Sequence, residues 1–249
     1  MLQSLWQMAQ SADISLWFWI GAVALGAGCL FFFVMGALDG PGHENHYNTS
    51  FFINLIAATT YAAMAFGMGK GTTGDGNVFF YARYIDWALT TPLLILNLAM
   101  IATFQVGRKT ALVASLIGLD LFMIATGFLS AIASGPAKWV FFGLSCFAFL
   151  GVLLVLWDEM RKEAAKLTWG EYQTYTKCLQ ALTFLWCAYP VVFLLGTEGL
   201  GRVSLEVEGM LYMVLDVASK LGFGLIVLAN VRKYIPKQEE VEVEDAILI

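Results

Sequence analysis

Charged residues are scarce in this chain of 249 residues: aspartate, glutamate, lysine and arginine together make up 13% of it. Hydrophobic residues make up 59%. A soluble domain of this length needs more polar surface, so the composition excludes an ordinary soluble protein. The class that fits is a polytopic membrane protein, which has the lipid bilayer as its surroundings.

Cysteine and histidine are rare as well, with four and two residues. The cysteines have no metal-ligand spacing and are expected to be small buried hydrophobic residues inside apolar runs: Cys29, Cys146, Cys178 and Cys187. His43 and His46 lie in the stretch "DGPGHENHYN" and are expected to be exposed loop residues. The sequence therefore predicts no metal site.

The motifs of several common enzyme classes are missing too. The chain has no phosphate-binding loop, no dinucleotide-binding fingerprint and no nucleophile elbow. Together with the composition, this lack favours a transporter or receptor over an enzyme, and we expect no nucleic-acid partner.

Long apolar runs recur along almost the whole chain. Each is about 20 residues long, enough for a helix to cross a hydrocarbon core of roughly 30 Å, whereas barrel strands are about ten residues long. The runs lie near residues 13–38, 47–69, 79–102, 109–133, 137–160, 173–197 and 205–231. They predict an all-α membrane protein, a seven-transmembrane-helix bundle formed by residues 1–232, followed by an acidic tail, residues 233–249.

Lysine and arginine are divided unequally between the two ends of these runs. One set of ends holds Arg108, Lys109, Arg161, Lys162, Lys166, Arg232, Lys233 and Lys237. The opposite set holds Lys70, Lys138 and Arg202. Because basic residues are enriched in cytoplasmic loops, we expect the N-terminus outside and the C-terminus in the cytoplasm. The first dozen residues do not resemble a cleaved signal, so the first helix is expected to direct insertion into the plasma membrane.

Several ionisable residues interrupt the apolar runs, where an unpaired charge is expensive. They are Arg83, Asp86, Asp120, Glu208, Asp216 and Lys220, with Glu198 at the outer end of the sixth run. A single polar residue could simply fix helix packing, but these residues recur at helical spacing. In "RYIDWALTTPLLILN", Asp86 and Thr90 share a helix face to which Asn97 returns, while Asp216 and Lys220 lie one turn apart. The pattern predicts a line of charges across the membrane, with nothing ionisable in its cytoplasmic half.

Lys220 indicates the chemistry of this line. Burial favours its neutral amine, which is suited to forming a Schiff base with an aldehyde. Once protonated, the imine is a cation that Asp86 and Asp216 can balance, and Arg83 can offset the second negative charge. Flat and apolar side chains flank these charges: Tyr84, Trp87, Leu94, Met123, Gly127, Phe142, Trp186, Tyr189 and Phe193. They predict a pocket for a long conjugated aldehyde.

The motifs "RYIDWALTTPLL" and "LDVASKLGFG" resemble those of the microbial rhodopsins, most closely the bacteriorhodopsin-type outward proton pumps. "GLDLFMIATG" and "WCAYPVVFLLGTEG" fit the same pattern, so the resemblance covers essentially all seven runs. It implies a seven-helix bundle that holds all-trans retinal on Lys220 through a protonated Schiff base. It also implies a homo-oligomer, a trimer or a pentamer.

The resemblance implies a role for each buried charge. Asp86 would be the primary proton acceptor, with Thr90 hydrogen-bonded to it, and Asp216 would be the second counterion. Arg83 would move between the Schiff base and the outside. The remaining acids, Glu198 and Glu208, would form a proton-release pair.

Other side chains would contact the retinal, as the resemblance implies. They are Tyr84, Trp87, Thr90, Leu94, Asp120, Met123, Gly127, Phe142, Ser145, Trp186, Tyr189, Phe193 and Asp216. Tyr61 would join Tyr84 in the polar network on the outer side of the retinal. Pro92 and Pro190 would bend the third and sixth helices, because proline removes a backbone donor.

Asn97 departs from the family pattern, which has an aspartate there as the internal proton donor. Asparagine has no proton to give, and the nearest other carboxylates, Asp39 and Glu44, are expected in the first cytoplasmic loop. The sequence therefore predicts reprotonation from cytoplasmic water without a carboxylic donor. Phe142 and Phe193 also replace tryptophans of the pattern.

Two functions remain open at this point. Asp86 argues against an anion pump and Asp216 against an inward pump, so the leading hypothesis is a light-driven outward proton pump. The alternative is a sensory photoreceptor that signals to a transducer, since sensory relatives often lack the inner donor as well. The retained glutamates Glu198 and Glu208 favour the pump. A seven-helix ligand receptor would leave Lys220 unexplained.

Overall fold

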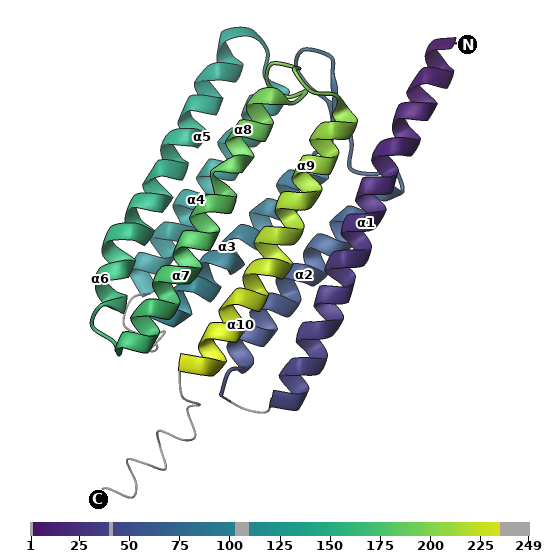
Figure 1. Ribbon diagram of the computed structural model, residues 1–249. Helices are drawn as coiled ribbons and strands as arrows, with labels where there is room; N and C mark the ends of the chain where they lie inside the picture. Colours follow the sequence, from purple (N-terminus) through teal and green to yellow (C-terminus); the bar gives the residue numbers. More distant parts are fainter. Residues whose placement is uncertain (1, 40–41, 103–109, 235–249) are drawn as a thin grey trace, which may run out of the picture.

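Long helices run up and down through the computed structural model, which describes residues 2–39, 42–102 and 110–234 (Figure 1). The first four transmembrane helices are α1 (Leu2–Asp39), α2 (Glu44–Ala65), α3 (Ala82–Ala102) and α4 (Thr110–Ile132). The fifth consists of α5 (Gly135–Val155), the π-helical turn η1 (Leu156–Met160) and α6 (Arg161–Ala164). The sixth consists of α7 (Trp169–Trp186) and α8 (Ala188–Leu195). The seventh consists of α9 (Leu205–Val217), the π-helical turn η2 (Ala218–Gly222) and α10 (Phe223–Tyr234).

The predicted seven-helix bundle is therefore confirmed. Within the described residues, six of the helices are long and apolar enough to cross a membrane. The other is α2, which begins with the polar stretch "ENHYNTS". It ends at Ala65, four residues before the predicted end of its run, and α3 begins at Ala82, three residues after the predicted start.

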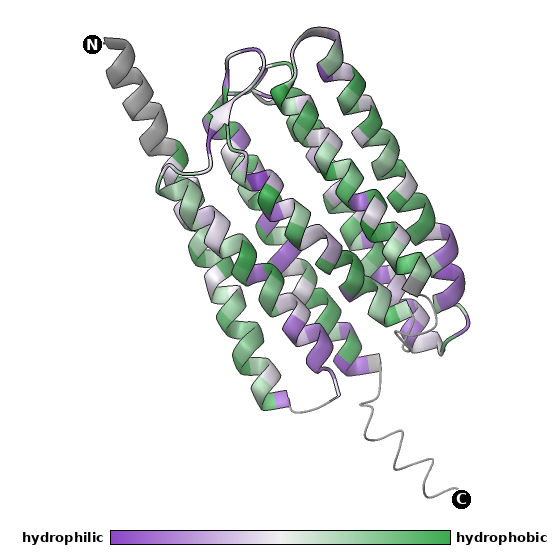
Figure 2. Cartoon of the chain, turned by 180° about the vertical axis from the view of Figure 1, so that it is seen from behind, coloured by the Kyte–Doolittle hydropathy of each residue, from purple (hydrophilic) through white to green (hydrophobic). Residues whose placement is uncertain are grey.

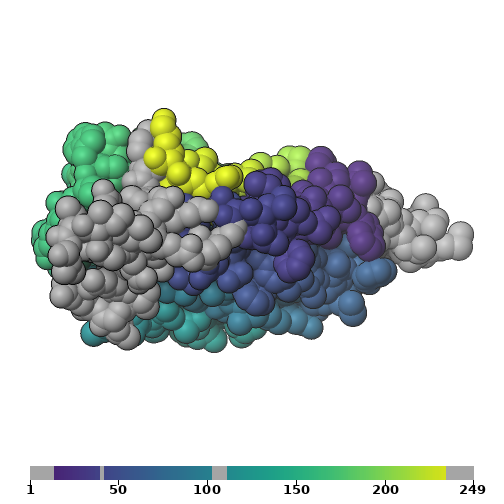
Figure 3. Space-filling view, turned by 90° about the horizontal axis from the view of Figure 1, so that it is seen from below, coloured from purple at the N-terminus to yellow at the C-terminus, as the bar shows by residue number. Residues whose placement is uncertain are grey.

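A short β-ribbon, which the sequence analysis did not predict, connects α2 to α3. Strand β1 (Gly71–Thr72) pairs antiparallel with β2 (Val78–Phe79), Gly71 lying opposite Phe79. We call the end of the bundle that carries this ribbon the ribbon end. The opposite end, where α1 and α10 finish, is the tail end (Figure 1). Viewed from the tail end, α10 lies between α1 and the helices of the fifth and sixth spans (Figure 3).

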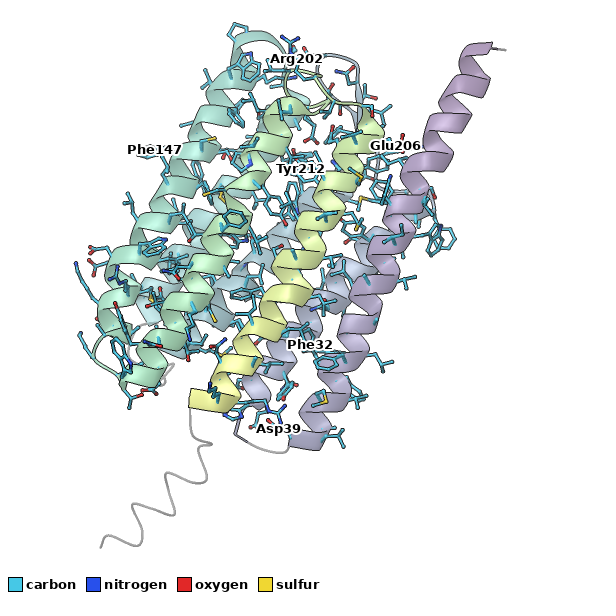
Figure 4. The ribbon with its side chains drawn as sticks, viewed as in Figure 1. Phe32, Asp39, Phe147, Arg202, Glu206 and Tyr212 are labelled. Atoms are coloured by element: carbon cyan, nitrogen blue, oxygen red, sulfur yellow. The ribbon has the colours of Figure 1, made fainter. Side chains whose placement is uncertain are left out.

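Hydrophobic residues occupy most of the length of the helices (Figure 2), and many of their side chains lie on the outer surface of the bundle. Large side chains are exposed there, including Phe147 at 76% and Phe184 at 80%, and Figure 4 shows Phe147 pointing away from the bundle. Contiguous apolar surface of this kind is not stable in water, whereas lipid tails solvate it. Together with the apolar helices, this surface identifies a multi-pass membrane protein.

Local signals explain where several helices begin and break. A capping box of Thr168 and Glu171 starts α7, and the Ser204 side chain accepts a hydrogen bond from the first turn of α9. The sixth span breaks between Trp186 and Ala188, next to Pro190, which has no backbone N–H. By contrast, α3 continues through Pro92.

The expectation that the cysteines are buried is right for Cys178 and wrong for the other three, and the expectation that the two histidines are exposed is wrong. Of the cysteines, Cys178 is buried, Cys29 and Cys146 are half-buried, and Cys187 is exposed, because an apolar helix faces lipid as well as the core. The histidines are not exposed: His43 precedes α2 at 4% exposure, and His46 lies in its first turn at 8%. The predictions for the acidic tail beyond residue 234 and for Arg108 and Lys109 lie outside the described residues.

Candidate functional site

Lys220 lies in η2, the π-helical turn in the middle of the seventh span. Such turns often occur at functional sites, because the extra residue changes which side chains face inward. The lysine is 2% exposed, and its Nζ lies 2.6 Å from Asp86 Oδ2 on α3 and 2.6 Å from Asp216 Oδ1 on α9. Helical spacing brings Asp216 to the buried amine, and the packing of α3 against the seventh span brings Asp86. Hydrogen bonds of this kind compensate a buried charge.

The two carboxylates differ in their other partners. Asp216 accepts hydrogen bonds from Tyr61 Oη at 2.6 Å, Tyr189 Oη at 2.8 Å and Trp87 Nε1 at 3.2 Å. Asp86 accepts from Lys220 through Oδ2, whereas its Oδ1 has no hydrogen-bond partner among the described residues. Donors stabilise a negative charge, so the surroundings hold the charge on Asp216 more firmly than on Asp86.

Two threonines lie beside these groups on α3. Thr90 Oγ1 donates to the backbone carbonyl of Asp86 at 2.8 Å, so the implied bond between Thr90 and Asp86 is made to the main chain. Thr91 Oγ1 lies 2.7 Å from Asp120 Oδ2 on α4 and 2.7 Å from the backbone carbonyl of Trp87. Thr91 therefore connects α3 to the buried Asp120, a contact that the sequence did not suggest.

A cavity begins at Lys220 and extends between the helices. Most of the residues expected to contact the retinal line it: Tyr84, Trp87, Leu94, Met123, Gly127, Phe142, Ser145, Trp186, Tyr189, Phe193, Asp216 and Lys220. The sequence analysis missed the following lining residues: Thr91, Ile124, Cys146, Phe149, Pro190, Tyr212 and Ser219. Thr90 and Asp120, which were expected there, do not line it. Tyr212 could have been found, since it lies one turn before Asp216.

The walls of the cavity are flat and closely packed. The rings of Phe142 and Phe193 stack with centroids 5.1 Å apart and planes 16° apart. Trp87 packs edge-on against Tyr189, with centroids 5.5 Å apart. At Gly127, an added Cβ would lie 3.3 Å from Ser145 Oγ, so a larger residue there would fill the cavity. The space suits a long, flat and apolar molecule that ends at Lys220.

A second group of charges lies between the cavity and the ribbon end. Arg83 Nη1 donates to Glu208 Oε1 at 2.7 Å, and both side chains are buried. Glu208 Oε2 accepts from the backbone N–H of Thr197 at 2.6 Å and from its hydroxyl at 2.8 Å. The Arg83 guanidinium also lies 4.5 Å from the ring centroid of Tyr212, which points into the bundle (Figure 4). Arg83 is thus held towards the ribbon end.

Glu198 lies in the turn between α8 and α9 and is 1% exposed. Neither of its carboxyl oxygens has a hydrogen-bond partner among the described residues. Burial, together with the nearby negative charge of Glu208, raises the pKa of Glu198 to about 8. At neutral pH this carboxyl group therefore holds a proton.

A third polar group lies between Lys220 and the tail end. Asn97 Nδ2 donates to Ser50 Oγ at 3.1 Å, and Asn97 Oδ1 lies 2.6 Å from His46 Nδ1. The three side chains are buried. The prediction that this half of the bundle contains nothing ionisable is wrong, because His46 can bind a proton. A signal was present, since His46, Ser50 and Tyr61 lie on one face of α2.

Comparison with known proteins identifies the family. The model of the bacteriorhodopsin-like protein family matches residues 12–234. The chain belongs to this family. It is 38% identical to archaerhodopsin-2 of Halobacterium sp. (strain aus-2), covering 87% of this chain and 84% of the relative. It is 37% identical to bacteriorhodopsin of Halobacterium salinarum, covering 86% and 83%.

Solved structures of family members agree with this result. The thermophilic rhodopsin of Rubrobacter xylanophilus superposes with a TM-score of 0.84 at 39% identity, covering 87% of this chain and 95% of that one. The rhodopsin of Coccomyxa subellipsoidea, a light-driven proton pump, superposes with a TM-score of 0.81 at 31% identity, covering 87% and 96%. The predicted resemblance to microbial rhodopsins is confirmed.

Proposed function

We propose that this protein is a light-driven outward proton pump that carries all-trans retinal covalently on Lys220. The observation that carries the proposal is the buried Lys220 amine between Asp86 and Asp216, at the end of a flat apolar cavity. The relatives add support, since the similar rhodopsin of Coccomyxa subellipsoidea is a light-driven proton pump.

The residues of the cavity fit retinal. Trp87, Trp186 and Tyr189 would hold its chain, and the stacked Phe142 and Phe193 would contact it further from Lys220. When bound, retinal would supply the absorption of light and a change of shape beside Lys220 Nζ. The protein supplies the fixed amine, the flat walls and the carboxylates that exchange the proton.

The basic residues give the proposed orientation. At the tail end, the described chain carries Arg161, Lys162, Lys166, Arg232 and Lys233. At the ribbon end it carries Lys70, Arg202 and Lys138, and Lys138 forms an ion pair with Asp75. By the positive-inside rule, the tail end faces the cytoplasm and the ribbon end and N-terminus face outside. We place the protein in the plasma membrane, as a trimer or pentamer.

The proton at Lys220 Nζ has a direct acceptor in Asp86. The separation of 2.6 Å between Nζ and Asp86 Oδ2 is within hydrogen-bond reach, as proton transfer requires. Asp216 is at the same distance, but Tyr61, Tyr189 and Trp87 hold its negative charge. Asp86 therefore takes the proton, and Asp216 remains the counterion.

Release of a proton at the ribbon end depends on Arg83, Glu208 and Glu198. When Asp86 becomes neutral, the attraction that draws Arg83 towards the site centre decreases. Arg83 then interacts more strongly with Glu208, to which it already donates at 2.7 Å, and with the neighbouring Glu198. A positive charge favours the anionic form of a carboxyl group, so the protonated Glu198 loses its proton to the outside.

Reprotonation of Lys220 Nζ must use the tail end, because net transport requires the two sides to alternate. Asn97 lies on this path and has no proton to give. The proton therefore comes from the cytoplasmic side without a carboxylic donor at this position.

Covalent attachment is tested by adding all-trans retinal to membranes that contain the protein. We expect a coloured pigment from the unchanged chain and none from Lys220→Ala, because the variant has no amine in the cavity. A Lys177→Ala variant removes a lysine from outside the cavity and should form the pigment normally. Equal pigment from the Lys220→Ala chain would disprove the site.

A sensory photoreceptor that signals to a transducer is the second candidate, and Asn97 favours it. Without a donor at that position, a slow return of the proton would prolong a signalling state. A sensor needs no release group, whereas this chain keeps Arg83, Glu198 and Glu208 buried together. Illumination separates the two functions: a sensor would form the pigment but would move no protons across the membrane.

A further inference from the structure

His46 makes a buried polar contact with Asn97 near the tail end. Its Nδ1 lies 2.6 Å from Asn97 Oδ1, and the side chain is 8% exposed. Asn97 Nδ2 donates to Ser50 Oγ, which fixes the amide so that its oxygen faces the imidazole. Because a carbonyl oxygen accepts, His46 Nδ1 carries the hydrogen of this bond. A protonatable ring is thus directed at the position where the family pattern has a proton donor.

Polar groups continue from His46 to the tail-end surface. The backbone N–H of His46 donates to the carbonyl of His43 at 3.0 Å, and His43 Nδ1 lies 3.4 Å from Asp39 Oδ2. Asp39 Oδ1 pairs with Arg232 at 3.2 Å, and the Arg232 side chain is 46% exposed. Figure 4 shows Asp39 at the very end of α1. Protonatable groups therefore lie at both the surface and the buried end of this series.

The charged groups near this series have opposite effects on the protonation of His46. Three helices contribute charged or titratable groups at this end. They are Asp39 of α1, His43 and Glu44 at the start of α2, and Arg232 and Lys233 of α10. The acids favour an imidazolium, and the basic groups disfavour it. The group from α3 that contacts His46 is the neutral Asn97. Burial of the His46 ring and the nearby His43 oppose its protonation, whereas the hydrogen bond to Asn97 favours it. His46 is a histidine, so it can both bind and release a proton.

We propose that His46 is the internal proton relay of this chain, in place of a carboxylic donor at Asn97; this inference rests on the proposed proton transport. The His46 imidazolium loses one proton past Asn97 and Ser50 towards Lys220 Nζ and becomes neutral imidazole. One proton from the cytoplasm, entering by way of Asp39 and His43, then restores the imidazolium. Each cycle therefore leaves His46 unchanged.

The pH dependence of reprotonation distinguishes a relay from direct transfer out of bulk water. Direct transfer slows about tenfold for each unit of rising pH, in proportion to the proton concentration. A relay gives a rate that is constant at pH values below its own titration and falls above it. Flash photolysis of the unchanged pigment between pH 5 and 9 should show this plateau.

Substitution of His46 should remove the plateau. We expect His46→Gln to slow reprotonation by at least about tenfold at pH 7 and to give a rate that falls throughout the pH range. Added imidazole buffer should restore part of the rate, because it supplies the missing acid. The control is Glu44→Gln, which changes an exposed titratable residue in the first turn of α2 that is not on the proposed path and should keep the plateau.

A second readout does not depend on transport or on light. The chain has two histidines, so nitrogen NMR of histidine-labelled protein in the dark gives two ring systems, assigned with His43→Gln. We expect one ring to titrate while its Nδ1 is hydrogen-bonded, and Asn97→Leu to shift that ring and not the other. A His46 ring that never titrates would overturn the relay.

The outcomes also separate the relay from the pump. A rate without a plateau, or a His46→Gln variant with the unchanged pH profile and no rescue by imidazole, would overturn the relay and leave an outward pump supplied from bulk water. A His46-dependent plateau in a pigment that moves no protons would support the relay and contradict the pump.

Discussion

At the residue scale, the two aspartates beside Lys220 differ in their other hydrogen-bond partners. Asp216 accepts from two tyrosine hydroxyls and one indole N–H besides Lys220, whereas Asp86 accepts from Lys220 and has one oxygen without a partner within the described part of the chain. The proposed roles, Asp86 as proton acceptor and Asp216 as counterion, rest on this difference. Such a division cannot be read from residue type, since both are aspartates.

The assignment of Asp86 is tested by Asp86→Asn. The amide occupies similar space but takes up no proton, so we expect pigment to form with Asp216 as counterion and light-driven proton movement to fall to background. Asp120→Asn is the control: Asp120 is equally buried but contacts Thr91 rather than Lys220. Proton movement in cells that express each variant gives the result, and strong pumping by Asp86→Asn would refute the assignment.

Glu198 gives a prediction about pH. Its pKa is raised to about 8, so the carboxyl group is protonated and able to release a proton below that pH, and already ionised above it. Prompt release after a flash, followed with a pH-sensitive dye, should therefore occur at pH 6–7 and disappear above about pH 8. Glu198→Gln should remove it at every pH.

The control for release is Glu206→Gln, since Glu206 lies in the first turn of α9 at the ribbon end but is not fully buried (Figure 4). It should release protons as the unchanged protein does. If Glu198→Gln released promptly as well, another group would be the source.

Asn97→Asp places a carboxyl group next to His46 and Ser50. A buried carboxyl group can deliver its own proton, so much of the pH dependence of reprotonation should disappear, and the rate at alkaline pH should rise. Asn97→Leu has similar size without a proton or a hydrogen bond and serves as the comparison. Flash photolysis across pH measures both, and an Asn97→Asp profile like that of the unchanged protein would contradict the placement of the path.

At the element scale, helical spacing explains why much of the site could be predicted from the sequence. Spacing alone was enough to assign two pairs of residues to inward faces: Asp86 and Thr90 on α3, and Asp216 and Lys220 across α9 and η2. Even so, spacing does not give contacts: the structure pairs Thr90 with the main chain and Thr91 with Asp120. The π-helical turn at Lys220 also could not be predicted, because it has no simple sequence signal.

The elements that were missed lie where the helical pattern stops. The ribbon of β1 and β2 has two residues in each strand, too few for alternation to be recognised, and the stretch between them is glycine-rich. His46 follows "DGPG", which predicts a loop, yet α2 begins at Glu44. Its burial depends on α3 bringing Asn97 alongside, a tertiary contact that no local pattern contains.

Helix α4 contributes two glycines that allow a controlled test of the cavity. Gly127 lines it, and an added Cβ there would lie 3.3 Å from Ser145 Oγ, whereas a Cβ at Gly118 would meet no atom within 4 Å. We expect Gly127→Leu to reduce the yield of pigment at least about fivefold, because its side chain fills the space for the ligand. Gly118→Leu should leave the yield nearly unchanged, as measured by absorbance after addition of retinal; equal yields would contradict the placement of the ligand.

At the scale of the whole molecule, the three polar groups of the proposed proton path lie in sequence along the bundle. Arg83 with Glu198 and Glu208 lies towards the ribbon end, Lys220 with its aspartates lies in the middle, and Asn97 with His46 lies towards the tail end. Apolar side chains fill the space between them and cover the lipid face.

The central claim is outward transport of protons by light, and proton movement in intact cells tests it most directly. Cells that express the chain with retinal are illuminated in unbuffered medium while the external pH is recorded, with and without a protonophore. The account predicts acidification that begins with the light, ends in the dark and is abolished by the protonophore. Alkalinisation, or no change of pH in a coloured sample, would contradict it.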